Sequence, residues 1–131
     1  MSHLELRAQM TVRPGQLEGF TAQAAELMRL TRELDTHTLR YEWFISEDRT
    51  RCEVHEAYES EQGLFEHNEH IMAARATLFR DFADGHHMTA YGTVSQRLVD
   101  LSEVHAGGLE VQAFLFGLQP APTAPGLEEE S

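Results

Sequence analysis

The stretch that decides the fold is residues 39–60, LRYEWFISEDRTRCEVHEAYES. Apolar and polar side chains alternate over residues 39–46 and again over residues 51–59, which is the period of a half-buried β-strand. Residues 47–50 between the two runs are all polar. The stretch therefore predicts a β-hairpin whose loop is residues 47–50.

The hairpin has a predictable register. If residues 47–50 form the loop, Tyr41 lies opposite Glu56 and Trp43 lies opposite Val54. One face of the hairpin then combines apolar and aromatic side chains with a single carboxylate. The residues of this face are Leu39, Tyr41, Trp43, Ile45, Cys52, Val54, Glu56 and Tyr58.

Regular patterns continue on both sides of the hairpin. Residues 3–12 alternate and predict a first strand, and helical spacing of apolar residues predicts an amphipathic helix from about Pro14 to Leu34. After the hairpin, Ser60 is the expected N-cap of a long helix that continues to about Asp84, where Asp84-Gly85 ends it.

The C-terminal third predicts three shorter elements. Residues 86–94 are rich in β-formers and predict a fourth strand, in which Gly92 marks a bulge or a close backbone contact. Residues 95–105 predict a short helix, which Gly107-Gly108 ends. Residues 109–116 predict one more strand, and that strand is apolar on both faces.

The order of these elements is βαββαβ, which predicts an α+β, ferredoxin-like fold with an extra C-terminal helix and strand. A chain of 131 residues fits one domain, here residues 1–117. Residues 118–131 are rich in proline and glutamate and hold little to bury, so we expect a disordered tail. The fold class by itself predicts no activity.

Acidic residues dominate the charge: 22 Asp and Glu stand against 10 Lys and Arg. Such a surface repels phosphate backbones and anionic lipids, so neither nucleic acid nor a membrane surface is expected as a partner. The single cysteine, Cys52, cannot close an internal disulfide, and no secretory leader precedes the first strand. We therefore expect a cytoplasmic protein.

Two titratable residues lie on faces that are otherwise apolar. His67 shares one helix face with Leu64 and Ile71 and should point toward the sheet, either as a core histidine with a hydrogen-bonded partner or as a base. Glu56 lies between Val54 and Tyr58, where a carboxylate needs a hydrogen bond or must stay protonated. The donor could be Tyr41, which lies opposite, or a backbone amide of the next helix.

The aromatic residues of the hairpin, Tyr41, Trp43 and Tyr58, are consistent with core packing or with the wall of a pocket for a flat ligand. The spacing His67-x-x-His70 could chelate a metal, but no third ligand converges by spacing, so no metal is expected. Cys52 is interpreted as inert packing. No glycine-rich loop opens a helix, so no nucleotide cofactor is implied.

The hairpin and the start of the following helix resemble the antibiotic biosynthesis monooxygenase family, and the resemblance extends over residues 3–116. The residues that carry it are 39–44, 54–60, Leu64 and His67. In that family a Glu-x-Trp or Glu-x-Tyr ends the third strand and a histidine follows one helical stretch later. The matching residues here are Glu56, Tyr58 and His67. The haem-degrading branch fits less well, because the first strand has no asparagine and a tyrosine replaces its tryptophan.

The resemblance implies a dimeric α/β barrel and therefore a homodimer. The apolar strand over residues 109–116 agrees, since a free edge of that composition should be covered by the partner. The implied reaction is cofactor-independent oxygenation of a quinol- or anthrone-type aromatic, with no cofactor, His67 as base and Glu56 as its polariser or as acceptor of the substrate hydroxyl. The implied substrate contacts are Tyr41, Trp43, Tyr58 and Ile71. The alternative is a non-enzymatic dimer of the same fold that binds a small hydrophobic molecule.

Overall fold

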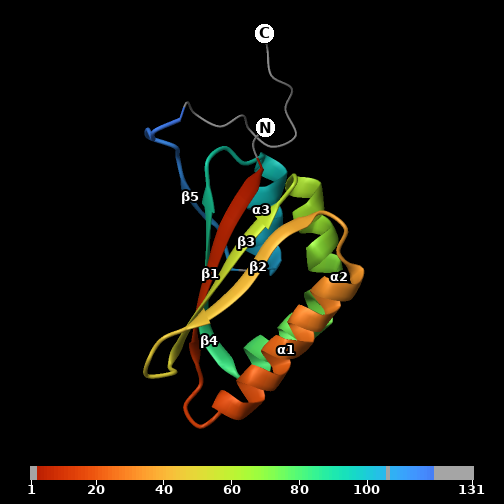
Figure 1. Ribbon diagram of the computed structural model, residues 1–131, viewed down its shortest axis with the longest axis vertical. Helices are drawn as coiled ribbons and strands as arrows, with labels where there is room; N and C mark the ends of the chain where they lie inside the picture. Colours follow the sequence, from red (N-terminus) through yellow and green to blue (C-terminus); the bar gives the residue numbers. More distant parts are fainter. Residues whose placement is uncertain (1–2, 106, 120–131) are drawn as a thin grey trace.

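The hairpin forms one side of a five-stranded sheet in the computed structural model, which describes residues 3–105 and 107–119 (Figure 1). Strand β2 spans Thr38–Ile45 and β3 spans Arg51–Tyr58. Tyr41 pairs with Glu56 and Trp43 with Val54, which confirms the predicted register for these residues. The prediction that Leu39 lies on the same inner face is wrong, because the pairing shifts between Thr38 and Arg40 and Leu39 is exposed.

The sheet has the order β2-β3-β1-β4-β5. Strand β1, Leu4–Val12, lies antiparallel between β3 and β4, Ala83–Tyr91. The additional elements are helix α3, Gln96–His105, and strand β5, Glu110–Gln112, which pairs parallel to β4. The predicted ferredoxin-like fold with an extra C-terminal helix and strand is confirmed.

Helices α1, Leu17–Leu34, and α2, Glu61–Asp81, cover one face of the sheet (Figure 1). Helix α1 begins after the predicted Pro14 because Gly15 has a φ of 77°, which a right-handed helix does not accept. The side chains between the helices and the sheet form one core. Its largest fully buried members are Tyr58, Leu4, Leu27, Leu64, Leu78, Leu98 and His67.

The prediction that α2 reaches Asp84 is wrong, since the helix ends at Asp81 and β4 begins at Ala83. The last turn is closed from outside the helix: Arg13 Nη1 donates to the Arg80 carbonyl at 2.7 Å and Nη2 pairs with Asp84 at 2.9 Å. A cationic side chain satisfies helix-end carbonyls in this way. The chain therefore turns directly into the strand.

The bulge predicted at Gly92 is not observed there, and the pairing of the fourth strand is irregular near its other end. The pairing of β1 with β4 shifts between Gln9 and Thr11, opposite the residues near Gly85. Gly92 follows the end of β4, has a φ of 99° and donates its N–H to the Gln112 carbonyl at 2.8 Å. A Cβ atom at this position would meet nothing within 4 Å, so neither predicted role explains Gly92, and its positive φ is the reason for a glycine here.

The prediction of a strand over residues 109–116 is too long, because β5 covers only Glu110–Gln112. Beyond β5 several apolar side chains are little covered by the described part of the chain: Leu115 is 83% exposed, Phe116 is 81% exposed and Leu118 is fully exposed. Most of the predicted disordered tail, residues 120–131, lies outside the described residues.

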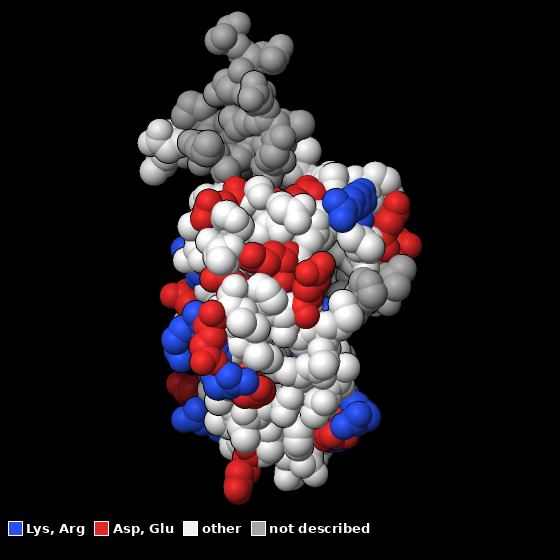
Figure 2. Space-filling view, turned by 90° about the vertical axis from the view of Figure 1, so that its right-hand side faces the viewer, with Lys and Arg blue, Asp and Glu red and all other residues white. Residues whose placement is uncertain are grey.

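Charge is spread unevenly over the helical side of the molecule. On the face that Figure 2 shows, acidic side chains gather across the upper half and basic side chains lie mainly near the margins. In the described part of the chain, no helix is long and apolar enough to cross a membrane.

Candidate active site

A pocket of about 20 Å³ lies between the inner face of the sheet and helices α1 and α2. A space of this size holds about one water molecule. Strands β2 and β3 contribute aromatic residues and a carboxylate to its wall, and α2 contributes a histidine. Except for Tyr58, every residue predicted for the site lines this pocket: Tyr41, Trp43, Glu56, His67 and Ile71.

His67 is the best-defined polar group of the pocket. Its side chain is 1% exposed, and Nδ1 lies 2.7 Å from Oδ2 of Asp35. The hydroxyl of Thr31 lies 3.5 Å from the same nitrogen. Within the described residues, Nε2 is buried and has no hydrogen-bond partner. A carboxylate that holds one nitrogen of an imidazole leaves the other nitrogen to accept or donate a proton.

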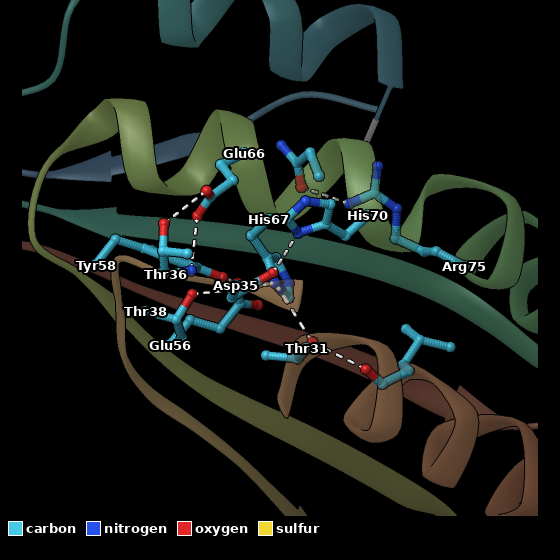
Figure 3. Close-up of polar contacts among 12 residues, drawn as sticks. Thr31, Asp35, Thr36, Thr38, Glu56, Tyr58, Glu66, His67, His70 and Arg75 are labelled. Atoms are coloured by element: carbon cyan, nitrogen blue, oxygen red, sulfur yellow. Dashed lines mark hydrogen bonds and ion pairs between the residues drawn. The ribbon is translucent and has the colours of Figure 1, made fainter. Parts of the chain in front are cut away.

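Asp35 joins two histidines. Figure 3 shows its carboxylate between His67 and His70, and Oδ1 lies 2.6 Å from Nδ1 of His70. The Thr38 hydroxyl donates to Oδ2 at 2.6 Å. Burial opposes ionisation of this carboxyl, but the hydrogen bonds from His67, His70 and Thr38 outweigh it and lower the pKa of Asp35 to about 2. The cluster therefore holds a buried anion.

Sequence reasoning missed Asp35, because the connection from Asp35 to His37 has the composition of an ordinary loop. The residue is the C-cap of α1, and its backbone N–H donates to the Thr31 carbonyl. A weak signal existed, since an aspartate between a helix and a strand that both pack on the core lies at the rim of that core. His70 was expected off the apolar face, and its side chain is indeed 24% exposed.

Glu56 is satisfied by a neighbour on its own strand. The Tyr58 hydroxyl donates to Oε1 of Glu56 at 2.5 Å, so the donor is neither of the two that alternation predicted, Tyr41 or a backbone amide. Glu56 is 6% exposed and Tyr58 is fully buried. Burial, and then the charge of Glu56, raises the pKa of Tyr58. Tyr58 lies behind the pocket wall and packs 5.4 Å from the His67 ring, centroid to centroid.

The aromatic side chains that line the pocket pack edge to face. The Tyr41 and Trp43 rings lie 5.9 Å apart at 88°, and the Tyr41 and His67 rings lie 4.7 Å apart at 66°. This is the geometry that aromatic pairs prefer. Of the two interpretations, core packing is therefore observed, and contact with a flat ligand stays a prediction.

Arg75 lines the pocket but was given no role from the sequence, although helical spacing places it on the same face as Ile71. Its Nη1 donates to Oδ1 of Asn68 at 2.9 Å (Figure 3). Burial lowers the pKa of the guanidinium, and the charge of Glu56 acts in the opposite direction. Among the described residues, no carboxylate oxygen lies within 4.0 Å of this cation.

Two further expectations concern metals and thiols. In the part of the chain that the structure describes, no group of three or more His, Cys, Asp or Glu side chains is arranged to hold a metal ion. His67 and His70 share a carboxylate through their Nδ1 atoms instead. Cys52 is 3% exposed, and burial raises the pKa of its thiol to about 12, as expected for inert packing.

Comparison with protein families gives one match. The model of the family described as "Antibiotic biosynthesis monooxygenase" matches residues 4–91, which include both strands of the hairpin and the whole of α2. No curated protein matches the sequence.

Solved structures share the fold at low sequence identity. MupZ from Pseudomonas fluorescens is 18% identical, with a TM-score of 0.73 over 95% of this chain and 100% of that one. Rv0793 from Mycobacterium tuberculosis is 21% identical, with a TM-score of 0.62 over 72% and 98%. A structure described as an antibiotic biosynthesis monooxygenase is 18% identical, with a TM-score of 0.62 over 70% and 99%. Likeness at these identities concerns the fold.

Proposed function

Because this chain belongs to the antibiotic biosynthesis monooxygenase family, we propose that it oxygenates an electron-rich aromatic substrate of the quinol or anthrone type without a cofactor. The observation that carries the proposal is the state of His67. Its Nδ1 is held by a buried carboxylate, while Nε2 is unpartnered within the described residues and lies at the pocket. This arrangement suits a general base.

The chemistry needs little from the protein beyond proton transfer and exclusion of water. His67 removes a proton from the substrate, and the resulting anion is electron-rich enough to reduce dioxygen. In an anthrone, a CH₂ group and O₂ give a carbonyl group and one water molecule. One oxygen atom stays in the product, and the other leaves as water with the two hydrogens of the CH₂ group.

The other predicted residues have roles that follow from their positions. Glu56 accepts a hydrogen bond from the substrate hydroxyl or polarises the base, and Tyr58 holds the Glu56 carboxylate in place. Tyr41 and Trp43 contact the edge of the substrate ring that enters the pocket. Ile71, which is buried beside His67 on α2, completes the apolar wall.

Replacement of His67 tests the assignment. With 1,8-dihydroxyanthrone as test substrate, His67→Ala should reduce oxygen uptake about 100-fold or more, the size expected for loss of a general base. The control is His55→Ala, because His55 pairs with Glu53 and does not line the pocket. Circular dichroism checks that each variant is folded. Unchanged oxygen uptake in His67→Ala would rule out this residue as the base.

The alternative function is a dimeric binding protein without turnover. The small volume of the pocket favours it, since about 20 Å³ admits only one group of a substrate rather than a whole ring. Two measurements on the same samples with the same aromatic compound, thermal melting and oxygen uptake, distinguish a monooxygenase from a binding protein. A binder shows a ligand-dependent rise in Tm with no oxygen uptake above that of buffer.

We propose further that the active form is a homodimer with residues 109–116 at the interface. Helices cover one face of the sheet and leave the other open (Figure 1). The exposed apolar side chains of residues 109–116 and just beyond them, which a second copy would bury, include Phe114, Leu115, Phe116 and Leu118. The family fold agrees with this assembly.

A further inference from the structure

A larger cavity, of about 180 Å³, lies between α2 and α3, outside the pocket described above. Leu64, Phe65 and Met72 from α2 form one wall, and Leu98 and Leu101 from α3 form another. Arg75 and Met88 line both this cavity and the small pocket. The two spaces are therefore neighbours, and the side chain of Arg75 stands between them.

Besides these apolar side chains, the cavity is lined by polar ones, and two of them are arginines that have no ion-pair partner among the described residues; the other polar residues of the lining are Asn68, Glu69 and Ser102. In the described residues, neither Arg75 nor Arg97 has a carboxylate oxygen within 4.0 Å. Arg75 is half-buried, and its hydrogen-bond partner is the neutral side chain of Asn68, whereas Arg97 is exposed at the rim of the cavity. Withdrawing a charge from water costs free energy unless a counter-charge is present. The one carboxylate of the described lining, Glu69, lies more than 4.0 Å from both guanidinium groups, so neither arginine is neutralised by an ion pair within the cavity.

The second arginine adds a flat surface. The guanidinium carbon of Arg97 lies 4.3 Å from the centre of the Phe65 ring, so the two groups stack. The N–H groups at the edge of a stacked guanidinium stay available to an oxygen anion. Met72 and Met88 line the same cavity, and methionine adapts its shape to flat ligands.

We propose that the cavity between α2 and α3 binds a planar aromatic ligand that carries an oxygen anion, with the anion paired to Arg75 and Arg97. The ring system fills the apolar part of the cavity. The small pocket beside His67 is too narrow to hold a complete ring system. That this ligand is the substrate rests on the proposed function, whereas the affinity of the cavity for an aromatic anion does not.

Binding of a matched pair of probes tests the inference. 2-Naphthoate and 2-naphthamide have nearly the same shape, and only the first is an anion. Isothermal titration calorimetry should show that 2-naphthoate binds to the full chain at least 10-fold more tightly than 2-naphthamide. Equal affinity for the two probes would overturn the proposal.

Variants locate the site. Arg75→Gln and Arg97→Gln should each weaken 2-naphthoate binding about 10-fold, the range expected for loss of a charge-assisted hydrogen bond. The control Arg32→Gln removes an exposed arginine of α1 and should leave the affinity unchanged. Met72→Trp, at an exposed position of the cavity wall, should block binding without disturbing the core. Wild-type affinity in Arg75→Gln and Met72→Trp would place the ligand elsewhere.

The outcomes separate this inference from the proposed function. If 2-naphthoate binding depends on Arg75 but the wild-type protein does not oxidise 1,8-dihydroxyanthrone, the cavity assignment holds and the proposed reaction fails. If oxidation depends on His67 but 2-naphthoate affinity is independent of Arg75, the reaction holds and the cavity assignment fails.

Discussion

At the scale of single residues, the geometry of the site depends on Asp35. Its carboxylate has both oxygens occupied, by His67 and Thr38 on one side and by His70 on the other. Its side chain is 2% exposed, so these partners replace the water that would otherwise solvate the charge. The position of the proposed base therefore depends on a residue outside the pocket wall.

The low pKa of Asp35 has a defined consequence for stability against pH. Because the pKa of about 2 lies below the ordinary value of 3.8, the ionised form stabilises the folded state. This contribution is complete above about pH 4 and is lost as the pH falls through 2. Asp35→Asn lacks it at every pH.

We therefore expect Asp35→Asn to lower the free energy of unfolding by about 1–3 kcal/mol at pH 6, the cost of a disrupted buried hydrogen-bond cluster. The difference from the wild type should shrink between pH 4 and pH 2. Urea unfolding followed by circular dichroism measures both. Asp100→Asn, at an exposed position on α3, is the control. A difference that stays constant down to pH 2 would contradict the linkage.

A second prediction at this scale concerns Tyr58, whose hydroxyl is the donor to Glu56. Tyr58→Phe keeps the ring and leaves a buried carboxylate without this donor, so the free energy of unfolding should fall by about 1–3 kcal/mol. Tyr91→Phe, at a position that is 42% exposed, should change it little. Chemical denaturation of both variants provides the comparison, and equal stability of the two would mean that the hydrogen bond contributes nothing.

At the scale of elements, the site requires α1 and α2 to pack closely. Gly19 of α1 lies against the ring of Phe82, the C-cap of α2, and a Cβ atom at Gly19 would lie 2.3 Å from Cε1 of that ring. Glycine is a poor helix former, so its presence within α1 is explained by this contact and not by helix propensity. The same packing brings Asp35, at the end of α1, to His67 on α2.

Gly19→Ala should lower the free energy of unfolding by about 1–3 kcal/mol, because overpacking at the helix contact outweighs the gain in helix propensity. Combining it with Phe82→Leu removes the clash and should restore part of the loss. Thermal unfolding by calorimetry measures both variants. A more stable Gly19→Ala protein would show that the ring moves aside at no cost.

At the scale of the whole molecule, the exposed apolar residues after β5 predict self-association. Leu115→Glu with Phe116→Glu should convert a dimer into a monomer of 14.9 kDa, measured by size-exclusion chromatography with light scattering. Leu34→Glu, at an exposed apolar position on α1, should leave the dimer intact. A wild-type protein that is already monomeric would contradict the proposed assembly.

Much of the fold follows from local periodicity. From Tyr41 to Ile45 the alternation is sufficient for the register of β2 against β3, because a shift by one residue would turn every side chain to the opposite face. The ends of helices and strands were less predictable from the sequence. The end of α2 depends on Arg13, and the shortness of β5 depends on how far it can pair with β4, and both are contacts between distant segments.

By itself, the sequence determined the order of strands and helices and the face on which Glu56 and His67 lie, because both follow from short periods along the chain. Only the tertiary structure decided which side chains contact Glu56 and His67. It brings Asp35 to His67 across 32 positions, replaces Tyr41 by Tyr58 as the donor to Glu56, and leaves Arg75 between two cavities. These contacts depend on how α1 and α2 lie over the sheet, which no local period specifies.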